Sequence, residues 1–363
     1  MENSANRAGC GHLYAGTVTT LAASVDAAIA SAIARSSDAT SHVGAAGEEL
    51  LQAVADAAAG GKRMRATLTI ESFHAHGGTD LAQILPVAAA LELFQAAALV
   101  HDDVLDDAET RRGRPTAHRA LAQAHADRHA GPHAARFGVA GAILAGDLAL
   151  VAAFRALDDV PRAVRELFGE MTELVTLGQY LDMRIAASPI ELLGDQERDI
   201  RATMRAKTAS YTAEFPLALG AAAAGKGPRA VAAARAAGVP AGIAFQLRDD
   251  LLGIVGDATH TGKPVGGDIR EGKRTVPLWH AWHNADDAGR AVIAAALGRA
   301  DAAAETVADA IEVIRASGAI EATEAQIDEA AAEAAERLAA LDIPPAAIAS
   351  LTTTLAGWGA RTS

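Results

Sequence analysis

The sequence predicts an all-α protein of roughly ten or more helices. Half of the 363 residues are hydrophobic but only 4% are aromatic, and much of the apolar share is alanine, the strongest helix former. From Leu21 onward the apolar residues follow a helical period, and no alternation of Val, Ile or Thr lasts long enough to form a sheet. Short Gly- and Pro-containing breaks separate the helices. We therefore expect a flexible tail at residues 1–20 and a single helical domain at residues 21–363.

The composition argues against several classes of protein. A single cysteine, Cys10, excludes a disulfide framework and a Cys-based zinc finger. A net charge of −13 argues against a nucleic-acid-binding protein, which normally carries a basic surface. The chain has no basic start followed by an apolar segment, and no run of about 18 apolar residues. We therefore expect a cytoplasmic protein without a transmembrane segment.

The stretch 86–107 predicts an apolar helix that ends in carboxylates. Like charges four residues apart destabilise a helix, and carboxylates at its C-terminal end oppose the helix dipole. A solvated helix end is the ordinary interpretation of such a run. Paired Asp oxygens followed by arginines, however, suit Mg²⁺ and the oxygens of a phosphate. The residues that favour metal-bridged diphosphate binding here are Asp102 with Asp106, Asp103 with Asp107, and the arginines Arg111 and Arg112.

A second pair of carboxylates, Asp249 and Asp250, closes another apolar helix. Cations follow this pair too, because the Gly-rich loop from Gly256 to Gly272 contains Lys263 and Lys273 comes directly after it. An isolated Asp pair is nearly uninformative. Its recurrence in the same context predicts two carboxylate-ended helices that together hold several Mg²⁺ ions around one diphosphate.

Several short motifs follow one another over about residues 60–275. They are Gly60-Gly61-Lys62-Arg63-Met64-Arg65, Phe94-Gln95 running into His101-Asp102-Asp103-Val104-Leu105-Asp106, Arg111-Arg112-Gly113, Gly141 to Asp147, Lys207-Thr208, and Phe245-Gln246 with Asp249-Asp250 and a Gly-Lys-Pro loop. In this order they resemble the polyprenyl synthetase family, the trans-isoprenyl diphosphate synthases, and most of all the bacterial geranylgeranyl diphosphate synthases. The resemblance implies the isoprenoid synthase fold, a helical bundle around a central cavity, and a homodimer.

The resemblance also implies the metal site. Its ligands would be Asp102, Asp106 and Asp249, with Asp103 and Asp250 completing the two motifs, and its cofactor would be Mg²⁺, three ions to each active site. The sequence departs from the family pattern at Gly253, four residues after Asp249, where an Asp is often found. That departure leaves the role of position 253 open.

The remaining matches concern the substrates. The diphosphate of isopentenyl diphosphate would be bound by Lys62, Arg65, Gln95 and Arg112. The diphosphate of the allylic substrate would be bound by Arg111, Lys207, Lys263 and Lys273. Thr208 and Gln246 match groups whose oxygens face the developing carbocation. The expected reaction is the head-to-tail condensation of isopentenyl diphosphate with an allylic diphosphate.

The helix that precedes Asp102 suggests the product length. At 1.5 Å per residue, Ala98 lies about 6 Å and Phe94 about 12 Å below Asp102, with Ala97 beside Ala98. In the family, bulky aromatics at the near positions stop growth at fifteen carbons. The two alanines leave room for a longer prenyl chain at these positions. If Phe94 ends the space available to that chain, the product is geranylgeranyl diphosphate, with twenty carbons. An aromatic at helical spacing is as often plain packing, so both interpretations of Phe94 stay open.

Three alternatives remain. The first is the same chemistry with a different product, of fifteen carbons or of twenty-five and more. The second is a class I terpene cyclase, which typically lacks the second Asp pair and the Gly-Gly-Lys-x-x-Arg pocket found here. The third is a non-catalytic regulatory subunit, against which the intact Asp102, Asp106, Lys62 and Arg111 argue. The Ala-, Asp- and Glu-rich region 281–363 carries no motif, and we interpret it as packing or oligomer surface.

Overall fold

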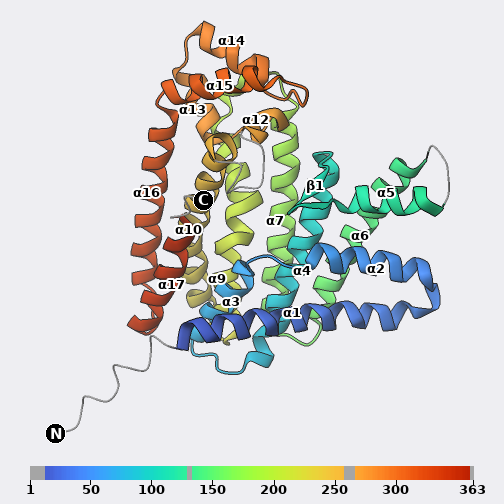
Figure 1. Ribbon diagram of the computed structural model, residues 1–363. Helices are drawn as coiled ribbons and strands as arrows, with labels where there is room; N and C mark the ends of the chain where they lie inside the picture. Colours follow the sequence, from blue (N-terminus) through green and yellow to red (C-terminus); the bar gives the residue numbers. More distant parts are fainter. Residues whose placement is uncertain (1–12, 129–132, 257–265, 360–363) are drawn as a thin grey trace. The chain divides into compact units, whose positions relative to one another are not determined.

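The computed structural model describes residues 13–128, 133–256 and 266–359, and most of them are helical (Figure 1). The predicted all-α fold class is therefore confirmed. The chain divides into two compact units: unit 1 contains the chain up to Ile70 and Thr79–Arg165, and unit 2 contains Glu71–Gly78 and the chain from Glu166 onward. The single domain expected from the sequence stays a prediction. Cys10 and Lys263 lie outside the described residues.

Unit 1 begins with a helix that starts earlier than expected. Residues 13–20, which we assigned to the tail, already belong to α1. The elements of this unit are α1 (Leu13–Thr40), the 3₁₀ turn η1 (Ser41–Val43), α2 (Ala45–Ala58), the start of α3 (Met64–Ala75), α4 (Leu81–Leu105), β1 (Thr110–Arg111), β2 (Arg114–Pro115), α5 (Ala117–Arg128), α6 (Ala134–Ala156) and the start of α7 (Arg162–Ala186).

Helix α4 is the central element of unit 1. It packs against α6, α1 and α2, and most of its apolar residues are buried. Two glycines of α6 allow its backbone to come close to its neighbours. A Cβ atom on Gly138 would lie 2.1 Å from the carbonyl oxygen of His118 on α5, and one on Gly146 would lie 2.2 Å from His101 Nε2 on α4. The end of α4 that carries the carboxylates thus packs closely against α6, which also lies against α5.

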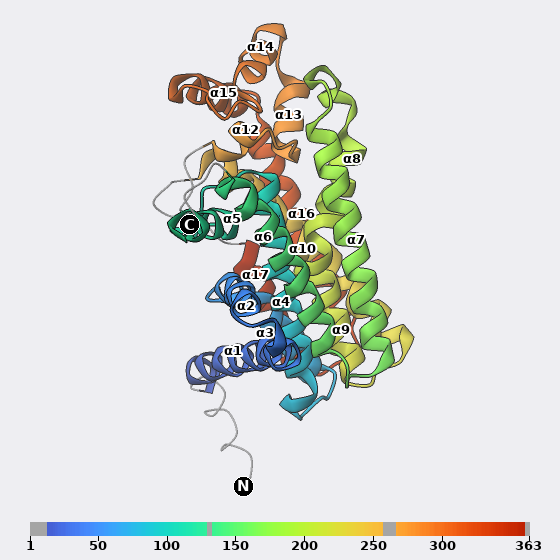
Figure 2. The same cartoon turned by 90° about the vertical axis from the view of Figure 1, so that its right-hand side faces the viewer.

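Unit 2 is built around α10, which packs against α16 and a π-helix. The elements of this unit are the end of α3, most of α7, the 3₁₀ helix η2 (Ile190–Asp195), α8 (Glu197–Thr203), the π-helix η3 (Met204–Glu214), α9 (Phe215–Ala223), α10 (Pro228–Val255), α12 (Gly267–Glu271), α13 (Val276–Asn284), α14 (Asp287–Ala296), α15 (Ala304–Ala316), α16 (Ala319–Ala339) and α17 (Pro345–Gly359). Figure 2 gives a second view of these helices.

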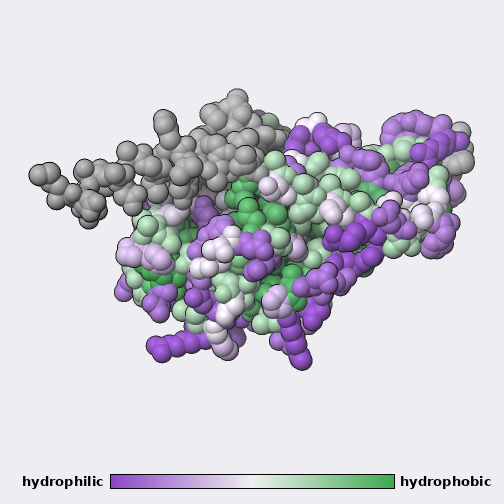
Figure 3. Space-filling view, turned by 90° about the horizontal axis from the view of Figure 1, so that it is seen from below, coloured by the Kyte–Doolittle hydropathy of each residue, from purple (hydrophilic) through white to green (hydrophobic). Residues whose placement is uncertain are grey.

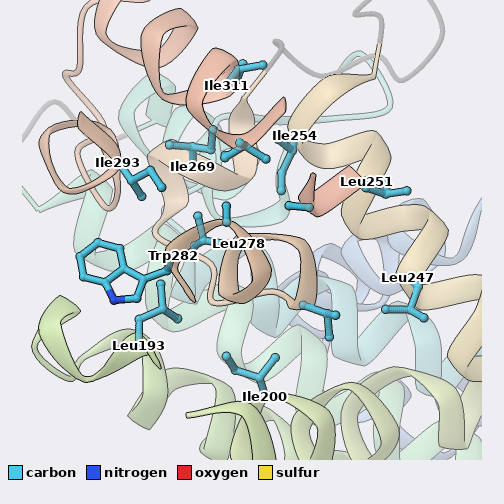
Figure 4. Packing of buried hydrophobic residues seen from close by; sticks show 14 of the residues in the cluster. Leu193, Ile200, Leu247, Leu251, Ile254, Ile269, Leu278, Trp282, Ile293 and Ile311 are labelled. Atoms are coloured by element: carbon cyan, nitrogen blue, oxygen red, sulfur yellow. The ribbon is translucent and has the colours of Figure 1, made fainter. Parts of the chain in front are cut away.

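One hydrophobic cluster supports the end of α10 that carries Asp249 and Asp250. Leu247, Leu251 and Ile254 of α10 lie among buried side chains from elements on both sides of it in the chain, η2 and α8 before it and α12 to α15 after it (Figure 4). The other labelled members of this cluster are Leu193, Ile200, Ile269, Leu278, Trp282, Ile293 and Ile311. The motif-free region 281–363 therefore supplies packing for the second acidic cluster.

Two glycines one turn apart bring α10 against η3. A Cβ atom on Gly238 would lie 2.5 Å from the carbonyl oxygen of Ala213, and one on Gly242 would lie 2.5 Å from that of Ala209. Such a distance leaves no room for any side chain, so the two backbones are in direct contact. A π-helix widens the helical turn and is frequent at functional sites, and η3 carries Lys207 and Thr208.

Three helices are long and apolar enough to cross a membrane by length and composition, namely α4, α6 and α10. Our expectation of no such segment is therefore not confirmed. In α4, 67% of the most apolar window is buried inside the protein, but in α6 only 39% is. Some hydrophobic residues do reach the surface, and Figure 3 shows one face on which they lie among hydrophilic ones.

The contact between α10 and η3 predicts that Gly242→Ala lowers the free energy of unfolding by about 1–3 kcal/mol, because the methyl group would overlap the Ala209 backbone. Urea denaturation measures this loss. The matched control is Gly169→Ala in α7, where a Cβ atom meets nothing within 4 Å. This control should gain up to about 1 kcal/mol, the difference in helix propensity. Equal effects of the two substitutions would contradict the close contact.

Candidate active site

The loop that leads into α3 is anchored by a buried arginine. Arg63 adopts a left-handed conformation with φ of 50°, and its guanidinium is only 7% exposed. It donates hydrogen bonds to Asp26 at 2.8 Å, to Glu92 at 3.1 Å and to the carbonyl oxygen of Ala58 at 2.8 Å. Three oxygens from α1, α2 and α4 therefore fix this loop.

Neither Arg63 nor Glu92 is predicted as a site residue by the sequence pattern. Glu92 is 6% exposed and its other oxygen accepts a hydrogen bond from the backbone N–H of Ala66. A buried carboxylate needs such partners. The sequence does contain a sign that Glu92 is unusual. It is the single charged residue of the largely apolar part of α4 before His101.

Next to this anchor the structure gathers the residues predicted to bind isopentenyl diphosphate. Arg65 is buried and donates from Nη1 to Gln95 Oε1 at 2.7 Å. Arg112, also left-handed with φ of 52°, donates to the carbonyl oxygen of Ala59 at 3.3 Å. Its guanidinium lies over Gly61, where a Cβ atom would be 3.1 Å from Nη1 and Nη2.

Lys62 is exposed. In the chain it follows Gly61, over which the Arg112 guanidinium lies, and it precedes the buried Arg63. Three cations and an amide thus occupy one part of unit 1. Guanidinium groups bind phosphate through two parallel hydrogen bonds, so this arrangement suits a diphosphate.

The first acidic cluster lies at the end of α4. Asp106 is the residue that caps this helix, and its backbone N–H donates to the carbonyl oxygen of Asp102 at 2.8 Å. The two side chains are therefore one turn apart on the same face. Asp103 is buried instead, and it accepts hydrogen bonds from Arg111, with its Oδ1 2.6 Å from Nη2.

Arg111 interacts electrostatically with all three carboxylates of the motif. Burial acts to lower the pKa of Arg111, but the hydrogen bond to Asp103 and the charges of Asp103, Asp102 and Asp106 outweigh burial and raise it. Arg111 therefore stays charged, and it supplies the cation that the like charges on this helix end require.

His101 ties the same helix end to α6. Its Nε2 lies 3.1 Å from the carbonyl oxygen of Ile143 and 3.6 Å from Asp147 Oδ1. This contact exists because Gly146 has no side chain. The glycine and Asp147 both belong to the fourth motif found in the sequence.

In unit 2, Lys207 is held by a residue that the sequence analysis missed. Its Nζ lies 2.6 Å from Asp182 Oδ2 on α7. Gly178, one turn earlier on α7, allows the approach, because a Cβ atom there would lie 2.5 Å from the backbone nitrogen of Lys207. Thr208 is the next residue of η3 and is half-buried.

The second acidic cluster has one exposed and one buried carboxylate. Asp249 is exposed, whereas Asp250 is buried and accepts a hydrogen bond from Gln246 Nε2 at 2.6 Å. Burial raises the pKa of Asp250 well above its usual range, and the charges of Asp268 and Asp249 raise it further. The hydrogen bond from Gln246 and the charge of Lys273 act in the opposite direction.

Asp268 occupies the space that a side chain at position 253 would take. A Cβ atom on Gly253 would lie 1.9 Å from Asp268 Oδ2. Asp268 is also 3.3 Å from Lys273 Nζ, and Lys273 pairs with Glu271 at 2.6 Å. A third carboxylate is therefore present beside Asp249 and Asp250, but it comes from α12 rather than from position 253. Asp268 is not predicted by the sequence pattern, because the contact joins residues fifteen positions apart.

The donor set fits Mg²⁺. Among residues 13–128, 133–256 and 266–359, no group of three or more His, Cys, Asp or Glu side chains forms a complete metal cage. Mg²⁺ does not need one, because it binds one or two carboxylates and completes its octahedral shell with waters and substrate phosphates. The pair Asp102 and Asp106 and the exposed Asp249 offer oxygen donors of this kind.

Comparison with known proteins decides the family. A model described as polyprenyl synthetase matches residues 48–314. The chain belongs to the polyprenyl synthetase family. Members of this family are metal-dependent trans-prenyltransferases, and so the chain is a trans-prenyltransferase.

Three relatives of this polyprenyl synthetase stand out. A short chain isoprenyl diphosphate synthase of Methanothermobacter thermautotrophicus is 35% identical over 289 residues, 78% of this chain and 82% of the relative. A geranylfarnesyl diphosphate synthase of Aeropyrum pernix is 34% identical over 74% of this chain and 80% of its own length. The crystal structure of a geranylgeranyl pyrophosphate synthase from Corynebacterium glutamicum, complexed with isoprenyl diphosphate and magnesium, has a TM-score of 0.84 and 36% identity, covering 93% of this chain and 97% of that one.

The residues predicted to set product length all lie on α4. Phe94 and Ala97 are buried, and Ala98 is partly exposed. The relatives of this synthetase make products of several lengths, so the individual roles of these residues stay predictions, as do those of the predicted substrate and metal ligands.

The overlap between positions 253 and 268 predicts a strongly non-additive pair of substitutions. Gly253→Ala should lower the free energy of unfolding by about 1–3 kcal/mol, since the Asp268 carboxylate must move away. In an Asp268→Ala background the same substitution should be neutral or stabilising, because alanine favours the helix. Urea denaturation of the four proteins measures the coupling. Additive effects would show that the two side chains do not compete for one space.

Proposed function

We propose that this synthetase condenses isopentenyl diphosphate head-to-tail with an allylic diphosphate, in a Mg²⁺-dependent reaction that yields linear geranylgeranyl diphosphate. The observation that carries this proposal is the pairing, within unit 1, of two different sites. A cationic pocket of Lys62, Arg65 and Arg112 accompanies an acidic helix end with Asp102 and Asp106. The reaction needs one site for each diphosphate.

The cationic pocket holds isopentenyl diphosphate. The bidentate guanidinium groups of Arg65 and Arg112 bind its diphosphate, and Lys62 adds a third positive charge. Gln95 keeps Arg65 in place through their 2.7 Å hydrogen bond. The rigid anchor at Arg63 fixes the loop, so little conformational freedom is lost when the substrate binds.

The allylic diphosphate is held through the two acidic clusters. Asp102, Asp106 and Asp249 are the metal ligands of this proposal, with three Mg²⁺ ions, and Asp103 and Asp250 support them. Bound Mg²⁺ supplies positive charge that stabilises the departing diphosphate. Support for magnesium comes from the oxygen donors of both clusters and from the Corynebacterium glutamicum relative.

The reaction itself is a substitution at the allylic carbon. Arg111, Lys207 and Lys273, and Lys263 outside the described residues, neutralise the diphosphate as its C–O bond breaks. The double bond of isopentenyl diphosphate attacks the allylic cation, and a proton then passes to the released diphosphate. Thr208 and Gln246 face the cation with their oxygens. The apolar residues of α4 exclude water, which would quench the cation.

The alternatives have less support. A terpene cyclase has no use for the pocket around Arg65 and Arg112. A non-catalytic subunit would not need the carboxylates of Asp102 and Asp106. Chain length is the open choice, because the relatives include short-chain, geranylfarnesyl and geranylgeranyl synthases. Small residues at Ala97 and Ala98 with Phe94 below them favour twenty carbons.

The proposal includes a homodimer in the cytoplasm. Support for the dimer comes from α6, where Phe137, Leu144 and Val151 recur every seven residues and remain 42–56% exposed. A repeat of seven places these side chains along one face of a helix, as at helix–helix interfaces. Ile143 and Phe154 extend the same apolar surface.

Loss of one metal ligand should abolish most of the activity. We expect Asp102→Asn to lower kcat by about 10²–10³-fold, the usual effect of removing one group that stabilises departing charge. The assay uses labelled isopentenyl diphosphate with an allylic primer, and EDTA should stop turnover in the unmodified protein. The control is Asp127→Asn, because Asp127 is an exposed carboxylate of α5 that accepts a hydrogen bond from Gln123 and has no proposed role in the reaction. Full activity of Asp102→Asn, or turnover without Mg²⁺, would contradict the proposal.

A bulky side chain at position 98 should shorten the product. In Ala98→Phe the ring fills the level about 6 Å below Asp102, so the main product should change from twenty to fifteen carbons. Chromatography of the dephosphorylated products measures the change. Ala98→Ser keeps the small volume and should leave the product unchanged. An unaltered product from Ala98→Phe would mean that this face of α4 does not line the growing chain.

A further inference from the structure

The π-helix η3 ends in an ion pair to which the reaction assigns no role. Glu214, the last residue of η3, is fully buried. Its Oε1 accepts a hydrogen bond from Arg235 Nε of α10 at 2.6 Å, and its Oε2 is buried without a hydrogen-bond partner among the described residues. A buried carboxylate is costly unless a cation compensates it. Arg235 therefore holds this end of η3 against α10.

Arg235 itself has three partners in unit 2. Besides Glu214, it donates from Nη1 to Glu170 Oε1 on α7 at 2.7 Å, and its Cζ lies 4.4 Å from the centroid of the Phe215 ring. Burial acts to lower the pKa of Arg235, but the hydrogen bonds to Glu214 and Glu170 and their charges outweigh burial and raise it. Arg235 therefore stays charged and joins α7, η3 and α10 at one point.

The winding of η3 sets the direction of a side chain near its other end. Lys207 lies near the start of η3, and its Nζ pairs with Asp182 of α7 at 2.6 Å. A π-helix has more residues per turn than the about 3.6 of an α-helix, so each residue turns the chain by less than about 100°. This difference accumulates from Lys207 to Glu214. When Glu214 is fixed, the direction of Lys207 therefore depends on the π-helical winding.

The residues of η3 do not themselves favour this winding. Most of Met204–Glu214 consists of Met, Arg, Ala, Lys and Glu, which favour an α-helix. π-Helices are rare and mostly single turns, whereas η3 has 11 residues. Contacts with neighbouring helices must therefore hold it. The glycines Gly238 and Gly242 let α10 approach the η3 backbone, and the ion pair with Arg235 fixes the rotation of its end.

We propose that Arg235 and Glu214 are positioning residues that keep η3 in its π-helical winding and thereby orient Lys207 toward the allylic diphosphate. The inference rests on the proposed function, which gives Lys207 its role. Arg235 and Glu214 act through Lys207 rather than on a substrate. Loss of their ion pair should therefore impair use of the allylic diphosphate and leave the binding of isopentenyl diphosphate, whose predicted pocket belongs to unit 1, unchanged.

The first test is the kinetics of Glu214→Leu. This substitution removes the acceptor and leaves no unpaired carboxylate, while Arg235 keeps its bond to Glu170. We expect kcat/KM for the allylic diphosphate to fall by about tenfold to a hundredfold, the cost of a misplaced group, at an unchanged KM for isopentenyl diphosphate. Glu214→Gln keeps an oxygen acceptor for Arg235 and should restore most of the activity. The control for lost stability alone is Ile314→Val in the core of α15, which should leave kcat/KM unchanged.

A double-mutant cycle separates positioning from a merely structural role. In a Lys207→Gln background, Glu214→Leu should lower kcat/KM little further, because the side chain that it orients is absent. An equal fall in both backgrounds, or full activity of Glu214→Leu, would overturn the inference while leaving the proposed reaction intact. Full activity of Lys207→Gln would overturn it as well, because Lys207 would then have no role to be positioned for.

Hydrogen exchange of the η3 backbone supplies a measurement that needs no turnover. The amides of Met204–Glu214 should exchange at least about tenfold faster in Glu214→Leu than in the unmodified protein, because this end of η3 opens more easily. Glu214→Gln and Ile314→Val should exchange like the unmodified protein. Unchanged exchange in Glu214→Leu would overturn the inference. Faster exchange in a protein without prenyltransferase turnover would support the role of the ion pair in η3 and refute the proposed reaction.

Discussion

The buried guanidinium of Arg63 is the interaction on which the arrangement of unit 1 depends. It joins Asp26 of α1, the end of α2 and Glu92 of α4 in one network. Arg65 lies two residues further along α3, so the same anchor sets its position against Gln95. Breaking such a buried network usually destabilises a protein strongly, because the remaining charge has no partner. The cationic pocket is therefore as rigid as the core beneath it.

The helical class and the two acidic helix ends were predictable because each depends on neighbours in the sequence. The start of α4 was harder to predict. We expected it near Pro86, but α4 begins at Leu81, where Asp80 accepts a hydrogen bond from the N–H of Ala82. Pro86 lies inside α4, where a proline removes one backbone hydrogen bond without ending the helix, so it does not mark where the helix begins. A cap is a better sign of the true boundary.

The residues that the sequence analysis missed act across the fold. Asp182 holds Lys207 from α7, and Glu92 holds Arg63 from α4. The π-helix η3 is also invisible to a periodicity argument, because its wide turn is stabilised by the close backbone of α10 at Gly238 and Gly242. Contacts of this kind depend on tertiary packing, which no local pattern encodes.

Asp268 beside Gly253 has a consequence for the side chains that this synthetase tolerates. In this chain the carboxylate comes from α12, and it fills the space that a side chain at position 253 of α10 would take. If aspartate replaced Gly253 while the Asp268 side chain kept its present position, the two carboxylates would crowd and repel each other. What position 253 tolerates therefore depends on the side chain at position 268, and we expect substitutions at the two positions to depend on one another.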